Sequence, residues 1–315
     1  MYTSRRYFTF RSQSFMPQAL DRMGMQQLED GKRYKRSYHG YRAEITIDHG
    51  FSKVAPITLP TPYEVHFHSN AILQLSEVSF RYPGAAKDII DNVSLDVSPT
   101  ARIGLLGPNG CGKSTLMNLL AGELKPTKGE VKKHHRLRIG YFSQHTVDQL
   151  DLSLTPLEQL RATYPDELIT EPQARAHFAQ VGISGQSSMV TKQSIRTMSG
   201  GQRNRVALGC VTYHQPHVLL LDEITNHLDM ASVEGIVESL RAFAGAVVVV
   251  SHDVWFLRQV VVGADEESDD EEDGEEKGEG GVLYVVNGKH GGLKKWETGL
   301  DDYVERVRKR AQKLG

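Results

Sequence analysis

Short hydrophobic runs separated by polar residues fill the chain from Ile72 onward, and their periods predict strands that alternate with helices. Strand patterns occupy residues 72–75, 78–82, 93–97, 102–106, 138–142 and 282–286. Residues 218–221 and 246–250 are continuously apolar, which is typical of strands covered on both faces. Helical patterns occupy residues 113–122, two short segments within 156–182, and residues 254–262 and 301–313. This alternation predicts an α/β fold with a mainly parallel sheet.

Two segments do not follow this pattern. Residues 1–68 lack sustained periodicity and are rich in Arg, Tyr, Ser, Gly and then Pro, so we expect a mostly irregular basic extension. Residues 264–281 are dominated by acidic residues and glycine and cannot build a core, so we expect a solvated, disordered insertion. The predicted organisation is an extension over 1–68, one domain over 69–305 that contains this insertion, and a basic helix end over 306–315.

The net charge of −2 conceals an uneven distribution of charge. Residues 265–279 hold eleven acidic residues and one lysine, a local charge of −10, so the rest of the chain carries +8. A basic remainder is compatible with nucleic-acid contact, which the net charge alone does not suggest.

The two cysteines and the composition of the first 20 residues indicate the cellular compartment. Cys111 and Cys210 lie inside motif-like segments, which indicates a reducing compartment without disulfides. No apolar stretch approaches the roughly 20 residues that span a bilayer. The first 20 residues contain three arginines and no acid, like a mitochondrial presequence, but without its amphipathic pattern. We therefore expect a cytoplasmic protein, with mitochondrial import as the alternative.

A glycine-rich segment between a predicted strand and a predicted helix has the spacing of a phosphate-binding loop. It consists of Gly107, Pro108, Asn109, Gly110, Cys111, Gly112, Lys113 and Ser114. Glycines let backbone N–H groups turn toward phosphate oxygens, and the helix N-terminus adds partial positive charge. Lys113 supplies a full charge to the phosphates, and Ser114 offers an oxygen to Mg²⁺. The alternative, a chance turn before a helix, does not account for the flanking strand and helix.

Two carboxylates follow the apolar run 218–221. Asp222 at the end of this strand is suited to hold Mg²⁺, and Glu223 beside it is suited to polarise a water for in-line attack. An acidic strand end is common by itself. Together with the glycine-rich loop it predicts a site that hydrolyses a nucleoside triphosphate.

The order of these and further signals resembles an ATP-binding cassette domain over about residues 71–305. The signals are Tyr82, the loop 107–114, Gln144, the run Ser199, Gly200, Gly201 and Gln202, the pair Asp222 and Glu223, Asp229 and His252. Residues 141–152, 225–229 and 299–303 are similar to the soluble ABC-F class of translation-associated ATPases. The resemblance implies a P-loop NTPase-type nucleotide-binding domain with a mainly parallel core sheet, an antiparallel β subdomain and a helical subdomain.

The resemblance also implies residue roles. Tyr82 would stack on adenine, and residues 107–115, Thr115 included, would bind the phosphates of ATP. Ser114, Gln144 and Asp222 would hold Mg²⁺. Lys113, Glu223 and His252 would act in catalysis, with His252 contacting the γ-phosphate. Ser199, Gly200, Gly201 and Gln202, at a helix that opens near Gln202, would together with Asp229 address the nucleotide of an opposing cassette.

One copy of each signal implies that a second cassette completes the site. ABC-F proteins normally hold two cassettes joined by a charged helical linker, and this chain corresponds to the second of them. The chain is therefore expected to pair with another copy of itself or with a different cassette protein, or to be a divergent or incomplete copy. Two residues depart from the family pattern: Met198 replaces a leucine, which we expect to be tolerated, and Ile224 replaces a proline. Loss of a compatible proline costs about 0.4–1 kcal/mol, so we expect slower hydrolysis.

Three basic stretches, 32–39, 132–136 and 306–310, are candidates for contact with the ribosome or ribosomal RNA; solvated surfaces are the alternative reading. The histidines at 66, 68, 134 and 135 lack further ligands, so we expect no metal centre built by protein alone. We therefore predict an ABC-F ATPase that acts on ribosomes through ATP-driven closure. The alternatives are a detached nucleotide-binding subunit of a membrane transporter and a binding module that does not hydrolyse ATP.

Overall fold

A computed structural model describes residues 57–64, 67, 70–143, 145–183, 188–225, 228, 230–263, 281–287 and 291–314, and two strands nearer the N-terminus. The chain divides into two compact units, Met1–Phe51 and Ser52–Gly315. In the first unit β1 (Met25–Gln27) pairs antiparallel with β2 (Arg33–Lys35), so the extension contains a strand pair that its irregular pattern did not predict. The acidic insertion 264–280 lies outside the described residues.

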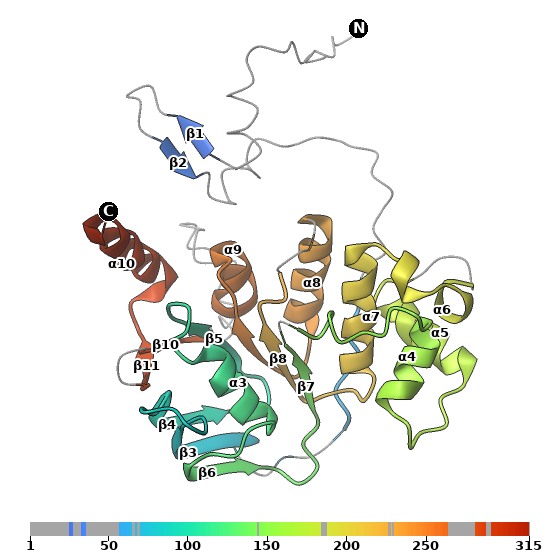
Figure 1. The fold of residues 1–315 in the computed structure, drawn as a ribbon, viewed down its shortest axis with the longest axis horizontal. Coiled ribbons are helices and arrows are strands. Elements are labelled where there is room, and N and C mark those ends of the chain that lie inside the picture. The colour runs from blue at the N-terminus through green and yellow to red at the C-terminus, as the bar shows by residue number, and fades with distance from the viewer. Residues whose placement is uncertain are drawn as a thin grey trace, which may run out of the picture. The chain divides into compact units, whose positions relative to one another are not determined.

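A six-stranded sheet forms the centre of the second unit (Figure 1). Its order is β11 (Leu293–Trp296), β10 (Val282–Val286), β5 (Arg102–Leu106), β9 (Ala246–Val250), β8 (Val218–Asp222) and β7 (Ile139–Phe142). Every neighbouring pair is parallel except β10 and β11. All residues of β8 and β9 are buried, as their continuous apolar runs predicted. The mainly parallel sheet is confirmed.

A second, antiparallel sheet has the order β4 (Ile90–Val97), β3 (Leu73–Phe80) and β6 (Lys128–Lys133). The two strands predicted at 72–75 and 78–82 are one strand, because a bulge shifts the register of β3 between Leu75 and Val78. Glu77 in this bulge has a φ of +48°. The sequence pattern did not predict β6, since five of its six residues are exposed and four are charged.

Helices make up the third part of the unit. The helical subdomain holds α4 (Pro156–Thr163), α5 (Glu171–Gln180), α6 (Ser188–Lys192) and α7 (Gly200–Thr212). Thr155 and Thr170 begin α4 and α5 with capping boxes, each followed by a proline in the first turn. The other helices are α3 (Lys113–Ala121), α8 (Met230–Ala242), α9 (Val254–Leu257) and α10 (Gly299–Leu314). The predicted end of α3 at Gly122 is confirmed, with φ +88°.

One predicted helix differs in detail, and one helix was not predicted. Residues 254–262 form α9 followed by a π-helical turn over Arg258–Val262, where the periodicity indicated one helix. The helix α8 was not predicted.

Residues 57–64, expected as part of the irregular extension, have no regular secondary structure but belong to the second unit. Ile57 is only 6% exposed. The backbone N–H groups of Thr58 and Tyr63 donate to the carbonyls of Gln180 and Gln215. Burial of an apolar side chain and pairing of backbone groups hold this stretch against the domain.

The bulge of β3 predicts an unequal effect of two similar substitutions. Gly129 and Gly84 both have positive φ, +77° and +82°. A Cβ on Gly129 would lie 2.3 Å from the carbonyl oxygen of Glu77, whereas a Cβ on Gly84 would meet nothing within 4 Å. Both alanine variants carry the conformational cost of about 1–2 kcal/mol. Gly129→Ala must also displace β6 from β3, so its free energy of unfolding should fall further. Chemical denaturation measures this, and equal losses in the two variants would contradict the register described.

Candidate nucleotide-binding site

The predicted site residues follow the carboxyl ends of neighbouring strands. The loop 107–112 follows β5, Ser251 and His252 follow β9, and Asp222 ends β8. Because β5, β9 and β8 are parallel neighbours, these ends lie at one edge of the sheet. In open α/β sheets ligands bind at this edge.

The glycine-rich loop wraps around the ammonium group of Lys113. Lys113 Nζ donates to the carbonyl of Gly107 at 2.8 Å and to that of Pro108 at 3.2 Å. Gly110 and Gly112 have φ of +75° and +104°, which a residue with a side chain rarely adopts. A Cβ on Gly112 would also lie 2.9 Å from Ile89. No described side chain caps the start of α3, so its first N–H groups remain for a ligand.

Cys111 is a packing residue of this loop. It is 3% exposed, and a Cβ on Gly107 would lie 2.7 Å from its sulfur. Burial raises the pKa of the Cys111 thiol, which keeps it protonated at neutral pH. A buried, protonated thiol fills space in the loop and is not suited to redox chemistry.

Asp222 joins the strand end to the loop. Its side chain is 2% exposed, and burial raises its pKa above the ordinary value. A hydrogen bond with Ser114 and the charge of Lys113 oppose this rise. A hydroxyl and a carboxylate side by side are oxygen ligands of the kind that Mg²⁺ prefers. The donor set therefore fits the predicted cation.

Glu223 lies next to Asp222 in a strained backbone conformation. Its φ is +57°, and its N–H donates to the carbonyl of Val250 at 2.9 Å. The side chain is 9% exposed, and its Oε1 lies 3.4 Å from Nε2 of His252. Among the described residues this oxygen accepts no hydrogen bond. Burial raises the pKa of Glu223, and the nearby His252 opposes the rise. A buried acceptor without a partner is suited to a water molecule.

Tyr82 lies beside the first turn of α3. Its hydroxyl is 3.4 Å from that of Thr115, and its ring packs edge-on against Phe80. The ring is 38% exposed, which leaves surface for a further aromatic contact.

The run from Ser199 to Gln202 forms the start of α7. The helix begins at Gly200, two residues earlier than the expected opening near Gln202, because a capping box joins Ser199 and Gln202. The N–H of Gln202 donates to Oγ of Ser199 at 3.2 Å, and the N–H of Ser199 donates to Oε1 of Gln202 at 2.9 Å. Ser199 and Gly200 are exposed, so this helix start faces solvent. Gln144 and Asp229 lie outside the described residues.

A cleft of about 720 Å³ extends from Ser114 and Asp222 to the helical subdomain. Tyr141, His145, Tyr164 and Cys210 are among its lining residues, and the sequence reasoning assigned none of them to the site. Tyr141 and His145 flank Gln144 in sequence, which is a signal that could have identified them. Tyr164 and Cys210 come from the region of α4 and from α7, and no local pattern marks them.

Comparison with known proteins agrees with this geometry. The family described as "ABC transporter" matches residues 90–226. An uncharacterized ABC transporter ATP-binding protein of Schizosaccharomyces pombe is 47% identical over 190 residues, 60% of this chain and 25% of that protein. ABC transporter F family member 4 of Arabidopsis thaliana is 41% identical over 214 residues, 65% of this chain and 29% of that protein. Protein GCN20 of Saccharomyces cerevisiae is 41% identical over 186 residues, 59% of this chain and 24% of that protein. The chain thus spans less than a third of the length of these relatives.

Solved structures show the same fold. The dimeric ATP-binding cassette MJ0796 bound to ADP and Pi has a TM-score of 0.56 at 23% identity, and the match covers 72% of this chain and 100% of that chain. The matched family segment contains the phosphate loop, the start of α7 and the Asp222–Glu223 pair. The chain therefore has the fold of the ATP-binding cassettes, and it is similar in sequence to the ABC transporter family over residues 90–226 and to parts of the F-family proteins.

Proposed function

We propose that the chain binds ATP with Mg²⁺ and hydrolyses it. The observation that supports this most directly is that Ser114 of the phosphate loop and Asp222 of the strand end line the same cleft. The charge of Lys113 opposes the rise in the pKa of both Asp222 and Glu223. The ammonium group and the two carboxylates therefore lie close enough to act on one bound nucleotide.

Each residue has a defined part in this proposal. Lys113 and the loop N–H groups hold the phosphates, and Ser114 and Asp222 hold Mg²⁺, with Gln144 as a further ligand. Mg²⁺, when bound, neutralises charge on the phosphates. Glu223 orients and polarises the attacking water, and His252 holds Glu223 and contacts the γ-phosphate. Tyr82 stacks on adenine. Ile224, in place of the expected proline, makes hydrolysis slow.

A second cassette completes the site in this proposal. The start of α7 faces solvent. The capping box uses the N–H groups of Ser199 and Gln202, so those of Gly200 and Gly201 in the first turn would address a nucleotide held by another cassette, together with Asp229. Dimers are described for the cassette MJ0796. The partner is another copy of this chain or a different cassette protein, and ATP between the two drives closure.

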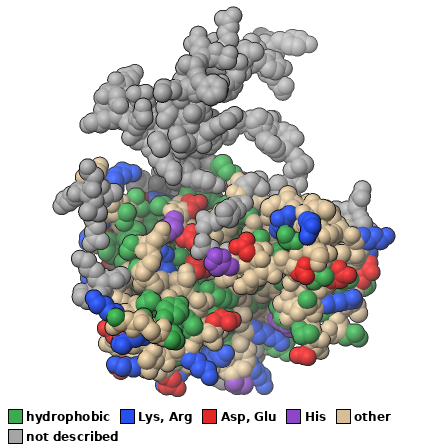
Figure 2. Space-filling view, viewed as in Figure 1, with side chains coloured by type: hydrophobic (Ala, Val, Ile, Leu, Met, Phe, Trp, Pro, Cys, Tyr) green, Lys and Arg blue, Asp and Glu red, His purple; other side chains and the backbone are tan. Residues whose placement is uncertain are grey.

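The process that this closure serves is proposed to be translation, with the ribosome or ribosomal RNA as partner, in a reducing compartment such as the cytoplasm. The relatives include F-family proteins, and exposed lysines and an arginine line β6 and the turn after it. Figure 2 shows basic side chains mixed with acidic ones along the edge of the molecule over the antiparallel sheet. None of the described helices is long and apolar enough to cross a membrane.

Asp222→Asn tests the cation site. Because burial raises the pKa of Asp222, its ionised form costs folding free energy at pH 7, so the asparagine variant should have the higher Tm without ligands. The difference should vanish below the ordinary carboxyl pKa, where both side chains are neutral. The same variant should lose the rise in Tm that Mg²⁺ and ATP give the wild-type chain. Thermal unfolding without ligands at pH 3 and pH 7 measures the first difference, and unfolding at pH 7 with Mg²⁺ and ATP measures the second. A lower Tm of the asparagine variant without ligands at pH 7 would contradict the cost of burying the ionised carboxylate.

Glu223→Gln tests the general base. The variant should bind ATP with nearly unchanged affinity, while phosphate release should fall at least about a hundredfold. Calorimetry and a steady-state phosphate assay measure the two quantities. Glu238→Gln, an exposed position on α8, is the control and should leave both unchanged. Turnover of Glu223→Gln at the wild-type rate would remove the assigned role.

The oligomeric state of Glu223→Gln with ATP tests the second cassette. Slow hydrolysis should trap the closed form, so ATP should convert monomer to dimer in sedimentation experiments. A wild-type chain that hydrolyses ATP as a monomer at every concentration would overturn the need for a partner.

Salt dependence tests the ribosome proposal. Binding to ribosomes should weaken steeply as salt increases. Each phosphate contact that is removed should make the slope of log K against log salt less steep by roughly one. The double variant Lys132→Ala with Lys133→Ala should show a less steep salt dependence than the wild-type chain. The control is Lys87→Ala with Lys192→Ala, two exposed lysines outside the basic stretches, which should leave the salt dependence unchanged. Cosedimentation that is absent or insensitive to salt would count against this partner, and capture of a polytopic membrane protein would favour a transporter subunit.

A further inference from the structure

Residues 57–64 form a strap that joins three helical elements of the cassette. Thr58 bonds the end of α5 through Gln180, and Tyr63 bonds Gln215 just after α7. The hydroxyl of Ser239 in α8 donates to the carbonyl of Ile57 at 2.6 Å, in a buried position. An irregular surface segment does not require bonds to so many elements. The strap is therefore a built part of the domain.

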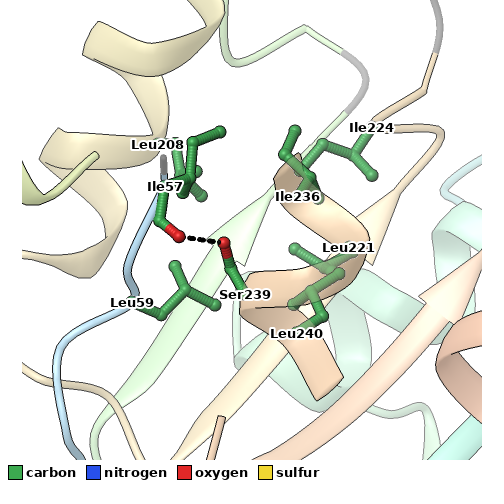
Figure 3. Close-up of a pocket in the computed structure, with 8 residues that line it drawn as sticks. All are labelled: Ile57, Leu59, Leu208, Leu221, Ile224, Ile236, Ser239 and Leu240. Carbon is green, nitrogen blue, oxygen red and sulfur yellow. Dashed lines mark hydrogen bonds between the residues drawn. The ribbon is translucent and has the colours of Figure 1, made fainter. Parts of the chain in front are cut away.

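The N-terminal end of the strap closes an apolar crevice (Figure 3). The crevice is lined by Ile57, Leu59, Leu208, Leu221, Ile224, Ile236, Ser239 and Leu240. It leaves no space for a water molecule. Ile57 is 6% exposed and Ile224 is 2% exposed, so both side chains are packed on all sides. Leu221 and Ile224 flank Asp222 and Glu223 in sequence, so the crevice that the strap helps to line also receives the residues on both sides of the carboxylate pair.

Glu223 needs such support because its backbone is strained. A residue with a side chain at φ +57° is higher in energy by about 1–2 kcal/mol than in the ordinary helical region. Such a conformation persists where the surroundings hold it. On one side the N–H of Glu223 is fixed by the carbonyl of Val250. On the other side the next residue, Ile224, is anchored by its side chain in the crevice.

We propose that Ile57 is a positioning residue for ATP hydrolysis, acting through Ile224 to hold the backbone of Glu223. This rests on the proposed function of Glu223. The family resemblance implies a proline at the position of Ile224, and proline fixes its own φ covalently. Isoleucine has no such constraint, so in this chain the packing of its side chain in the crevice that Ile57 also lines holds the loop.

The proposal is tested first without nucleotide. Ile57→Ala removes three carbons from the crevice wall, so the amides of residues 221–225 should exchange with deuterium faster than in the wild-type chain. Ile57→Val, which keeps most of the wall, should show a much smaller change. Thr58→Ala is the matched control, because its side chain is exposed and its backbone bond is kept. Unchanged exchange at residues 221–225 in a folded Ile57→Ala protein would overturn the proposal.

The catalytic consequence is tested by kinetics. Ile57→Ala should lower kcat at least about tenfold, as expected when a catalytic group is misplaced, with the Kd for ATP unchanged. A general loss of folded protein would instead lower the active fraction and would appear in Tm and in exchange across the whole chain. A tenfold fall in kcat with a parallel loss of ATP affinity would contradict a role through Glu223.

A double-mutant cycle shows whether Ile57 acts through Ile224. If it does, Ile57→Ala should have little further effect on kcat in an Ile224→Ala chain. Effects that multiply would mean that the two residues act independently and would overturn the proposed route. If the wild-type chain hydrolyses no ATP, the proposed function fails, but exchange at residues 221–225 still decides whether the strap holds the loop.

Discussion

The buried carboxylate of Asp222 beside Ser114 is the interaction on which the site depends. Asp222 ends a fully buried strand, so the protein holds it in place and raises its pKa. Ser114 and Lys113 lower this cost, and both belong to the turn from loop to α3. A buried charge with incomplete compensation is a site prepared for a cation. The contact also fixes β8 relative to the loop after β5.

The order of the strands brings the other predicted site residues close to Asp222 and Ser114. β5, β9 and β8 are adjacent and parallel, so the loop, His252 and the carboxylates meet although they are far apart in sequence. The helical subdomain contributes the start of α7, which lies exposed at its surface. The phosphate loop, His252 and the carboxylates therefore meet within the domain, whereas the start of α7 is exposed at the surface. This division is the basis for the proposal that a second cassette supplies the groups that one copy of each signal cannot.

Sequence patterns predicted those features that depend on local composition. Residues 218–221 and 246–250 are strands because continuous apolar runs are buried on both faces, and the loop 107–114 is recognisable because its glycines occupy positions with positive φ. The patterns did not predict β6, whose residues are mostly polar, or the bulge that makes β3 one strand. Nor did they predict the packing of Ile57 on α8, because the contact with Ser239 joins residues 182 positions apart. Such contacts follow from the tertiary fold and leave no periodic signal.

The substitution of isoleucine for proline at position 224 shows how these two kinds of information combine. The family resemblance alone indicates only that position 224 lacks the covalent constraint of proline. This suggests a looser loop after Glu223 and slower hydrolysis of ATP. In the structure the isoleucine side chain is buried in a dry crevice, which a residue without a large apolar side chain would not fill. A packed side chain restricts the backbone that carries it, since moving it would open a cavity. The departure from the pattern that the resemblance implies thus exchanges a constraint within one residue for packing in a crevice shared with the strap. In our proposal the geometry of Glu223 then depends on Ile57, 166 positions before it.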